Sequence, residues 1–80
     1  MFYLYILQSL KDNNIYIGIT SNLEERLKRH NAGYERATKG RIPFKLIHSE
    51  SFANRIEARN KEKYLKSGFG REMIRKLLLQ

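Results

Sequence analysis

Two short runs near the N-terminus alternate between apolar and other side chains in the manner of β-strands. Phe2–Leu7 and Ile15–Thr20 are rich in β-branched and aromatic residues, and the segment between them contains Asp and Asn, which favour tight turns. A hairpin with a two- or four-residue loop pairs odd positions of the first strand with even positions of the second. One face then carries only hydrocarbon, and the other carries Tyr3 and Tyr5 with Tyr16, Gly18 and Thr20. A three-residue loop would change this pairing.

The rest of the chain contains helix signals at two asparagines. Asn22 with Glu25, and Asn54 with Glu57, form capping boxes that begin helices. In chain order the predicted elements are strands over 2–7 and 15–20, a helix over 22–31 stopped by Gly33, a surface loop over 34–41, a strand over 44–48, and helices over 54–66 and 71–79. This order, ββαβαα, predicts an α+β fold with a small, mainly antiparallel three-stranded sheet flanked by helices, as a single domain of residues 1–80.

Several polar side chains fall on faces that ought to pack inward. At 100° per residue, Arg26 and His30 lie in the same stripe as the leucines of the first helix, and Glu62 lies between Ala58 and Leu65 on the second. Polar groups facing a core need a partner or a function, because their burial is costly otherwise.

Composition restricts the chemistry. The chain has 80 residues, with 16 Lys and Arg against 8 Asp and Glu, for a formal charge of +8. This excess favours a polyanionic partner, and nucleic acid is the commonest. The absence of cysteine excludes disulfides, thiolate metal sites and cysteine nucleophiles. The longest apolar run is far below the roughly 20 residues that span a bilayer, and no secretory signal is recognisable. We therefore expect a cytoplasmic protein with no membrane partner.

The inward-facing polar residues suit phosphodiester hydrolysis. That reaction needs a base for the attacking water, a cation for the charge on phosphorus, and a metal for the leaving oxygen. Phenol, guanidinium and a carboxylate-held Mg²⁺ or Mn²⁺ would supply these groups. Each residue also has an ordinary explanation: a packed tyrosine, a solvent-reaching Arg26, a His30 favoured by the helix dipole, and a Glu62 paired with Lys66.

The motifs resemble those of the GIY-YIG nuclease domain over nearly the whole chain. They are Tyr3-Leu4-Tyr5, Tyr16-Ile17-Gly18, Arg26 with His30, and Glu57-Ala58 with Glu62. The sequence is most similar to small stand-alone bacterial members, which are similar to the N-terminal nuclease module of excinuclease C. The resemblance implies that Tyr5 or Tyr16 is the base, with the pairing parity favouring Tyr5. It also implies that Gly18 lets phosphate approach, that Arg26 contacts the scissile phosphate beside His30, and that Glu62 alone binds the metal.

Three features depart from the family pattern. The first motif lacks its glycine, Ile19 and Thr20 stand where some members have a lysine, and no asparagine follows Asn60. A free phenol ionises only near pH ~10, so activity is expected to favour alkaline pH. These departures motivate an alternative, a non-catalytic nucleic-acid-binding module that retains the fold. A third hypothesis is a component of a larger repair assembly.

The leading prediction is a metal-dependent DNA endonuclease that acts in DNA repair or recombination and leaves 5′-phosphate and 3′-hydroxyl ends. Its expected substrates include branched or damaged DNA, and a repair or recombination protein is a further expected partner. Phosphates are bound by cations whatever the base sequence. The residues predicted to grip the DNA backbone are Arg36, Lys39, Arg41, Lys45, Arg55 and Arg59.

Overall fold

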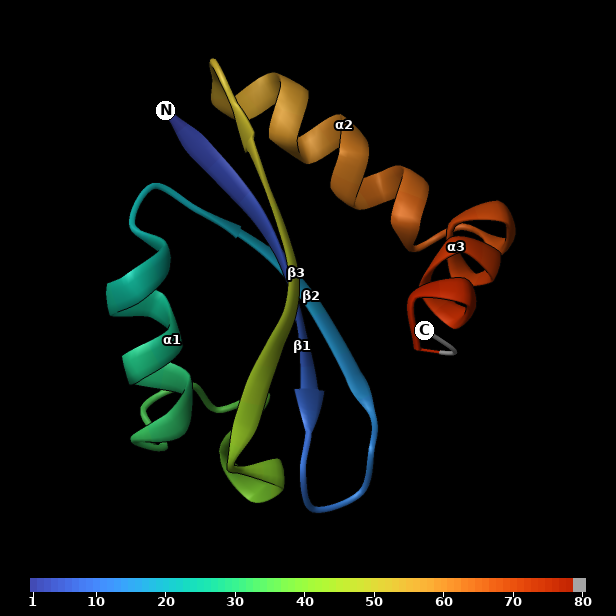
Figure 1. The fold of residues 1–80 in the computed structure, drawn as a ribbon. Helices are drawn as coiled ribbons and strands as arrows, with labels where there is room; N and C mark the ends of the chain where they lie inside the picture. Colours follow the sequence, from blue (N-terminus) through green and yellow to red (C-terminus); the bar gives the residue numbers. More distant parts are fainter. Residues whose placement is uncertain (79–80) are drawn as a thin grey trace.

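The computed structural model describes residues 1–78, which form one sheet with helices on both sides (Figure 1). The elements in chain order are β1 (Phe2–Ser9), β2 (Ile15–Thr20), α1 (Leu23–Asn31), the short 3₁₀ helix η1 (Lys39–Arg41), β3 (Phe44–Phe52), α2 (Arg55–Leu65) and α3 (Gly68–Leu78). The predicted α+β class and the order ββαβαα are confirmed.

The sheet has the strand order β2-β1-β3, and both strand pairs are antiparallel. Tyr5 lies opposite Gly18 and Ile6 opposite Ile17, so odd positions of β1 pair with even positions of β2. The Ser9 backbone N–H donates to the Asn14 carbonyl oxygen at 2.9 Å, which closes a four-residue loop. The predicted pairing is therefore confirmed.

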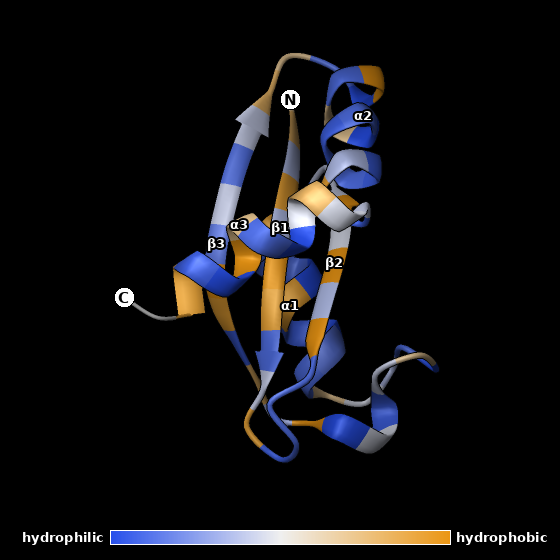
Figure 2. Ribbon diagram, turned by 90° about the vertical axis from the view of Figure 1, so that its right-hand side faces the viewer, coloured by the Kyte–Doolittle hydropathy of each residue, from blue (hydrophilic) through white to orange (hydrophobic). Residues whose placement is uncertain are grey.

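Each face of the sheet packs against different helices. Helix α1 covers one face, and α2 and α3 cover the other (Figure 1). Leu4 and Ile6 belong to the hydrocarbon core beneath α2 and α3, whereas Tyr5 and Leu7 pack with Phe44 on the side of α1. Strand β1 is central and covered on both faces, which explains its nearly continuous apolar run (Figure 2).

Both predicted helix starts are present, although each capping box is only half formed. The Asn22 side-chain oxygen accepts from the Glu25 N–H at 3.1 Å, and Asn54 does the same for Glu57 at 3.0 Å. Glu25, however, lies 3.4 Å from the side-chain amide of Asn22. The Asn22 backbone N–H donates instead to the Thr20 hydroxyl at 3.1 Å, so Thr20 takes the place predicted for Glu25.

Two predicted boundaries and the description of one loop were wrong. Strand β3 continues to Phe52, because the first residues of β1 pair with it and Phe2 lies opposite Phe52. Helix α3 begins at Gly68 rather than Arg71, and its predicted end, Leu79, lies outside the described residues. The segment 34–41 is not simply a surface loop, since it includes η1 and a buried Thr38.

None of the helices within residues 1–78 combines the length and the apolar character needed to cross a membrane.

Candidate active site

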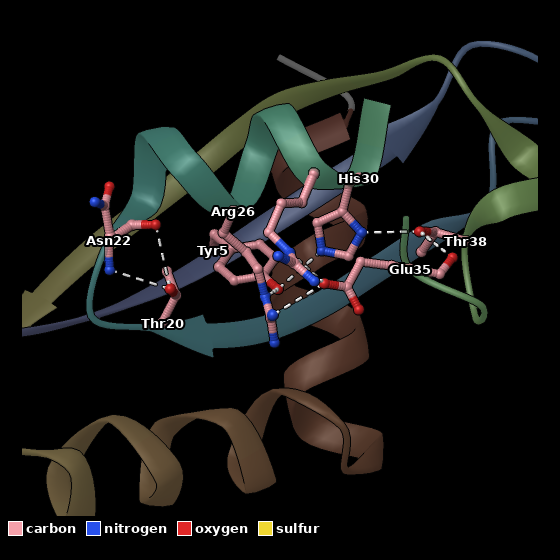
Figure 3. A network of polar contacts seen from close by, with 8 residues as sticks. Tyr5, Thr20, Asn22, Arg26, His30, Glu35 and Thr38 are labelled. Carbon is pink, nitrogen blue, oxygen red and sulfur yellow. Dashed lines mark hydrogen bonds and ion pairs between the residues drawn. The ribbon is translucent and has the colours of Figure 1, made fainter. Parts of the chain in front are cut away.

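Tyr5, Arg26 and His30 meet between β1 and α1 (Figure 3). The Tyr5 hydroxyl lies 3.1 Å from His30 Nε2, and the Arg26 Nε–H donates to the same hydroxyl at 3.4 Å. The half-buried Tyr16 lies beside them on β2, with its ring centroid 6.3 Å from that of Tyr5 and 5.0 Å from that of His30. The predicted proximity of Tyr5, Tyr16, Arg26 and His30 is thus present in the structure.

His30 is enclosed on every side and has no exposed surface. Its Nδ1 lies 2.8 Å from the Thr38 hydroxyl, and the rings of Tyr5 and Phe44 pack edge-on against it. Desolvation by burial lowers the pKa of His30 from its usual value, because the charged imidazolium loses its hydration. His30 is therefore a neutral imidazole at pH 7, able to accept a proton at one nitrogen and donate at the other.

The hydrogen bond between Arg26 and Tyr5 shifts the pKa values of both groups. Burial raises the pKa of the Tyr5 phenol, and the hydrogen bond from Arg26 partly opposes this effect. The same hydrogen bond raises the pKa of Arg26. Arg26 also contacts Glu35, through one guanidinium nitrogen 3.0 Å from Oε1. The site therefore contains a neutral phenol beneath a fully charged guanidinium.

Gly18 makes room for the Tyr5 ring. A Cβ on Gly18 would meet the Tyr5 hydroxyl oxygen and would lie 2.6 Å from Cζ. The structure thus gives the absent side chain a role that the sequence did not suggest, because the phenol crosses β2 at this position to reach Arg26 and His30. Approach of phosphate over Gly18 stays a prediction.

Glu62 lies on α2, across the sheet from α1 (Figure 1). Its residue is 8% exposed. One carboxylate oxygen is 3.6 Å from an Arg59 guanidinium nitrogen, and the other is 3.4 Å from Lys66 Nζ. Within residues 1–78, no cluster of three or more His, Cys, Asp or Glu side chains is placed to hold a metal ion. Glu62 is therefore a nearly buried carboxylate, paired with Arg59 and Lys66 and outside the hydrogen-bond network of Tyr5.

The six predicted DNA-binding cations are all exposed, but they do not form one patch. Arg36, Lys39 and Arg41 lie on the connection between α1 and β3, at the end of the molecule opposite to the start of α2 (Figure 1). Lys45 follows at the beginning of β3, whereas Arg55 and Arg59 lie on α2. Arg41 and Arg59 are also paired, with Asp12 at 3.6 Å and Glu62 at 3.6 Å.

The structure adds Glu35, Thr38 and Arg29 to the site. Glu35 Oε1 lies 3.3 Å from the Arg29 Nε as well as beside Arg26, and Thr38 contacts His30. Of these three residues, only Glu35 stood out in the sequence, because it is the one acid among the cations of the segment 34–41. Thr38 gave no signal, because a threonine in a polar loop is ordinary. A shallow pocket of 220 Å³ beside these residues is lined by Thr20, Ser21, Asn22, Glu25, Arg26 and Arg29.

Comparison with known proteins identifies the family and supports the fold. Residues 1–76 match the family described as the GIY-YIG catalytic domain, a family of nucleases. A UPF0213 protein of Clostridium perfringens is 48% identical over 67 residues, which cover 82% of this chain and 71% of that protein. A UPF0213 protein of Staphylococcus haemolyticus is 39% identical over 77 residues, covering 95% and 92% of the two chains.

A solved structure shares the architecture. The solution NMR structure of a UPF0213 protein from Bacillus halodurans is 34% identical and covers 96% of this chain and 85% of its own, with a TM-score of 0.58. A family match along nearly the whole described chain, together with these relatives, shows that the protein belongs to the GIY-YIG nuclease-domain family.

Proposed function

We propose that the protein is a metal-dependent DNA endonuclease whose reaction centre is the junction of Tyr5, Arg26 and His30. The observation that carries this proposal is the charged Arg26 guanidinium bonded to the Tyr5 phenol, with neutral His30 on the other side of the same hydroxyl. The cation that would bind phosphate, the candidate base and a proton acceptor thus meet at one oxygen atom, that of the Tyr5 hydroxyl.

Arg26 is the group that binds the scissile phosphate. Its side chain is 37% exposed and its partner in the free protein is the Glu35 carboxylate, an anion whose two oxygens resemble those of a phosphodiester. DNA phosphate replaces Glu35 on the guanidinium, because a guanidinium donates hydrogen bonds to carboxylate and phosphate oxygens alike. Arg29, which shares Glu35, then holds the displaced carboxylate.

Tyr5 is the base that takes the proton of the attacking water. Its residue is only 1% exposed, and Arg26 covers the hydroxyl through a long contact of 3.4 Å. A phosphate that draws the guanidinium outward uncovers the phenol. Tyr16 is half-buried beside it and positions the water from the neighbouring strand.

Glu62 is the residue that would hold Mg²⁺ or Mn²⁺. Its hard carboxylate oxygens suit these ions, and its present partners are the long, exposed side chains of Arg59 and Lys66 at 3.6 and 3.4 Å, which can move aside. The donor set therefore fits one ion that keeps mostly water and phosphate ligands. When bound, the ion supplies charge neutralisation at the leaving oxygen.

Exposed cations on both faces of the sheet bind the flanking DNA phosphates. Arg36, Lys39 and Arg41 lie on the connection after α1, and Lys45 lies at the start of β3. Arg55 and Arg59 lie on α2, where they line a shallow pocket of 470 Å³. Contacts to the backbone alone give little base specificity. This arrangement supports a substrate that follows the edge strand β2 between the two helical layers, as branched or damaged DNA in repair or recombination can do.

The test is cleavage of supercoiled plasmid and of a branched oligonucleotide in Mg²⁺ and in Mn²⁺, from pH 7 to 9. Tyr5→Phe, Arg26→Ala and Glu62→Gln should each lower the nicking rate by at least about 100-fold. Tyr16→Phe is run in parallel, and a larger loss for it than for Tyr5→Phe would make Tyr16 the base.

Matched controls make the same chemical change at exposed positions outside the site. These are Tyr34→Phe, Arg75→Ala and Glu57→Gln, and each should keep the wild-type rate. Nicking that survives the three site variants would contradict the proposed site. Salt-sensitive binding of DNA without cleavage, unaffected by metal or by Glu62→Gln, would support the non-catalytic binding module instead.

A further inference from the structure

Thr38 is a buried polar residue with no role in the chemistry described above. It lies just before η1, is 1% exposed, and its hydroxyl is 2.8 Å from His30 Nδ1. The same hydroxyl donates to the backbone carbonyl of Glu35 at 3.4 Å. A chain of hydrogen bonds therefore runs from Tyr5 through His30 and Thr38 to a backbone carbonyl.

The hydrogen bond to the Glu35 carbonyl fixes which group donates in each of the other hydrogen bonds. A carbonyl oxygen can only accept, so a Thr38 hydroxyl that donates to Glu35 must receive its other hydrogen bond from His30 Nδ1–H. His30 is neutral, so Nε2 then carries a lone pair and accepts the Tyr5 phenolic proton. In this arrangement every proton of the chain has an acceptor.

The alternative, in which the Thr38 hydroxyl donates to His30, leaves the phenolic proton of Tyr5 without an acceptor. If Thr38 donated to Nδ1, then Nε2–H and Arg26 Nε–H would both donate to the Tyr5 oxygen. The phenolic proton would then face no acceptor among the described residues, although Tyr5 is 1% exposed. Buried donors are almost always paired, so the first direction is favoured.

We propose that Thr38 is a positioning residue that holds His30 as the Nδ1–H tautomer, with Nε2 aimed at the Tyr5 hydroxyl. The consequence for catalysis rests on the proposed endonuclease function. Thr38 touches neither substrate nor reacting atoms and acts only through His30.

The tautomer gives Tyr5 a route for its proton at neutral pH. An O–H bond of the attacking water breaks and its proton goes to the Tyr5 oxygen, while the phenolic O–H bond breaks and that proton goes to His30 Nε2. The water oxygen bonds to phosphorus, the bond from phosphorus to the 3′ oxygen breaks, and the 3′ oxygen takes a proton from solvent water. The hydroxide ion so formed then takes the proton of the Tyr5 hydroxyl, and His30 Nε2 returns its proton to the Tyr5 oxygen, which restores both groups. The net acceptor during the attack is the imidazole, so a phenol whose pKa is raised by burial need not be ionised beforehand.

The charged and titratable groups around His30 are compatible with this role. Glu35, on the connection after α1, raises the pKa of His30, whereas Arg26 on α1 lowers it less strongly than burial does. Tyr5 on β1 and Tyr16 on β2 face the ring edge-on and carry no carboxylate or ammonium group. The imidazolium formed during the reaction is therefore stabilised mainly by Glu35 once Arg26 has moved to phosphate.

The first test reads the tautomer directly in the full-length chain by long-range ¹H–¹⁵N NMR of the imidazole nitrogens at pH 7.5. His48→Gln removes the other histidine signal and serves as the background. We expect Nδ1 to give the signal of a protonated nitrogen and Nε2 that of an unprotonated one. A wild-type Nε2–H tautomer would overturn the proposal without the need for any variant at Thr38.

The second test uses two substitutions that differ in the hydroxyl. Thr38→Val keeps the shape and removes the acceptor, and Thr38→Ser keeps the acceptor. We expect Thr38→Val to lose the Nδ1–H tautomer and to lower kcat by at least about tenfold with KM unchanged, and Thr38→Ser to retain both properties. If Thr38→Val fails to fold, as judged by thermal unfolding, Thr38→Ala takes its place in the spectrum.

The outcomes separate this inference from the proposed function. An unchanged tautomer in Thr38→Val refutes the positioning role, whatever the cleavage rate. Absence of cleavage in the wild type refutes the endonuclease, while the spectra still decide whether Thr38 sets the tautomer.

Discussion

The contact between Gly18 and Tyr5 yields a sharp test of how the site is built. In Gly18→Ala, the new Cβ would meet the Tyr5 hydroxyl and lie 2.6 Å from Cζ, whereas ordinary contact begins near 3.4 Å. The ring must therefore retreat by about 0.8 Å or more. This movement of the Tyr5 ring lengthens the hydrogen bonds of its hydroxyl to His30 and Arg26, which measure 3.1 and 3.4 Å.

The magnitude follows from the confinement of the ring. Tyr5 is buried against Leu7 and Phe44, and overpacking of such a site costs about 1–3 kcal/mol. For a chain of this size, a loss of about 2 kcal/mol lowers Tm by roughly 10 °C. Misplacement of a catalytic group by about 1 Å lowers the rate by about 100-fold, so nicking should fall by that factor.

The assay is thermal unfolding together with plasmid nicking, with Gly40→Ala as the matched control, because no atom lies within 4 Å of a Cβ built at Gly40. In a Tyr5→Phe background, which removes the hydroxyl, Gly18→Ala should cost at least about 0.5 kcal/mol less in unfolding free energy. An equal cost in both backgrounds, or a wild-type Tm for Gly18→Ala alone, would refute the reasoning.

Three further predictions concern stability and binding. Gly70→Ala should destabilise the fold by about 2 kcal/mol in thermal unfolding, because its Cβ would overlap the backbone of Tyr64 and Leu65, while Gly68→Ala, with open space around it, should not; equal Tm values for the two would contradict this packing. Burial holds the pKa of His30 below its unfolded value, so the unfolded state binds more protons and stability should decrease as pH falls below about 6.5. Urea unfolding at pH 5 and 7.5 measures this loss, which His30→Gln should reduce; an unchanged loss would mean that His30 is not its source. If about five phosphates are neutralised, log affinity for DNA should fall with log salt with a slope of about −4.5, and a slope near zero in a fluorescence titration would exclude backbone binding.

The fold was largely predictable because its signals are local. The parity of the hairpin follows from the alternation of side chains, and the helix starts at Asn22 and Asn54 follow from hydrogen bonds that span three residues. The length of β3 was missed because its later residues are polar or mixed. They form a strand only because β1 lies beside them, as the pairing of Phe2 with Phe52 shows.

The candidate site was predictable only in part. The sequence by itself determined that Arg26 and His30 point inward, because helix periodicity fixes such directions. It placed Tyr5 and Tyr16 on one face only for a hairpin loop with an even number of residues. It also determined the charge of +8, but not where the charge lies. Arg36 and Arg55 are as exposed as predicted, yet they belong to segments at opposite ends of the molecule.

Only the tertiary structure decided what surrounds those side chains. Thr38 and Glu35 reach His30 and Arg26 because the connection between α1 and β3 folds back over the end of α1, and no local pattern encodes that path. Gly18 is required because a phenol from another strand crosses it. Hydrophobic periodicity is a property of one element, whereas hydrogen-bond partners and close approaches depend on how distant segments pack. The sequence therefore specified the candidate chemical groups, and packing specified which of them act together.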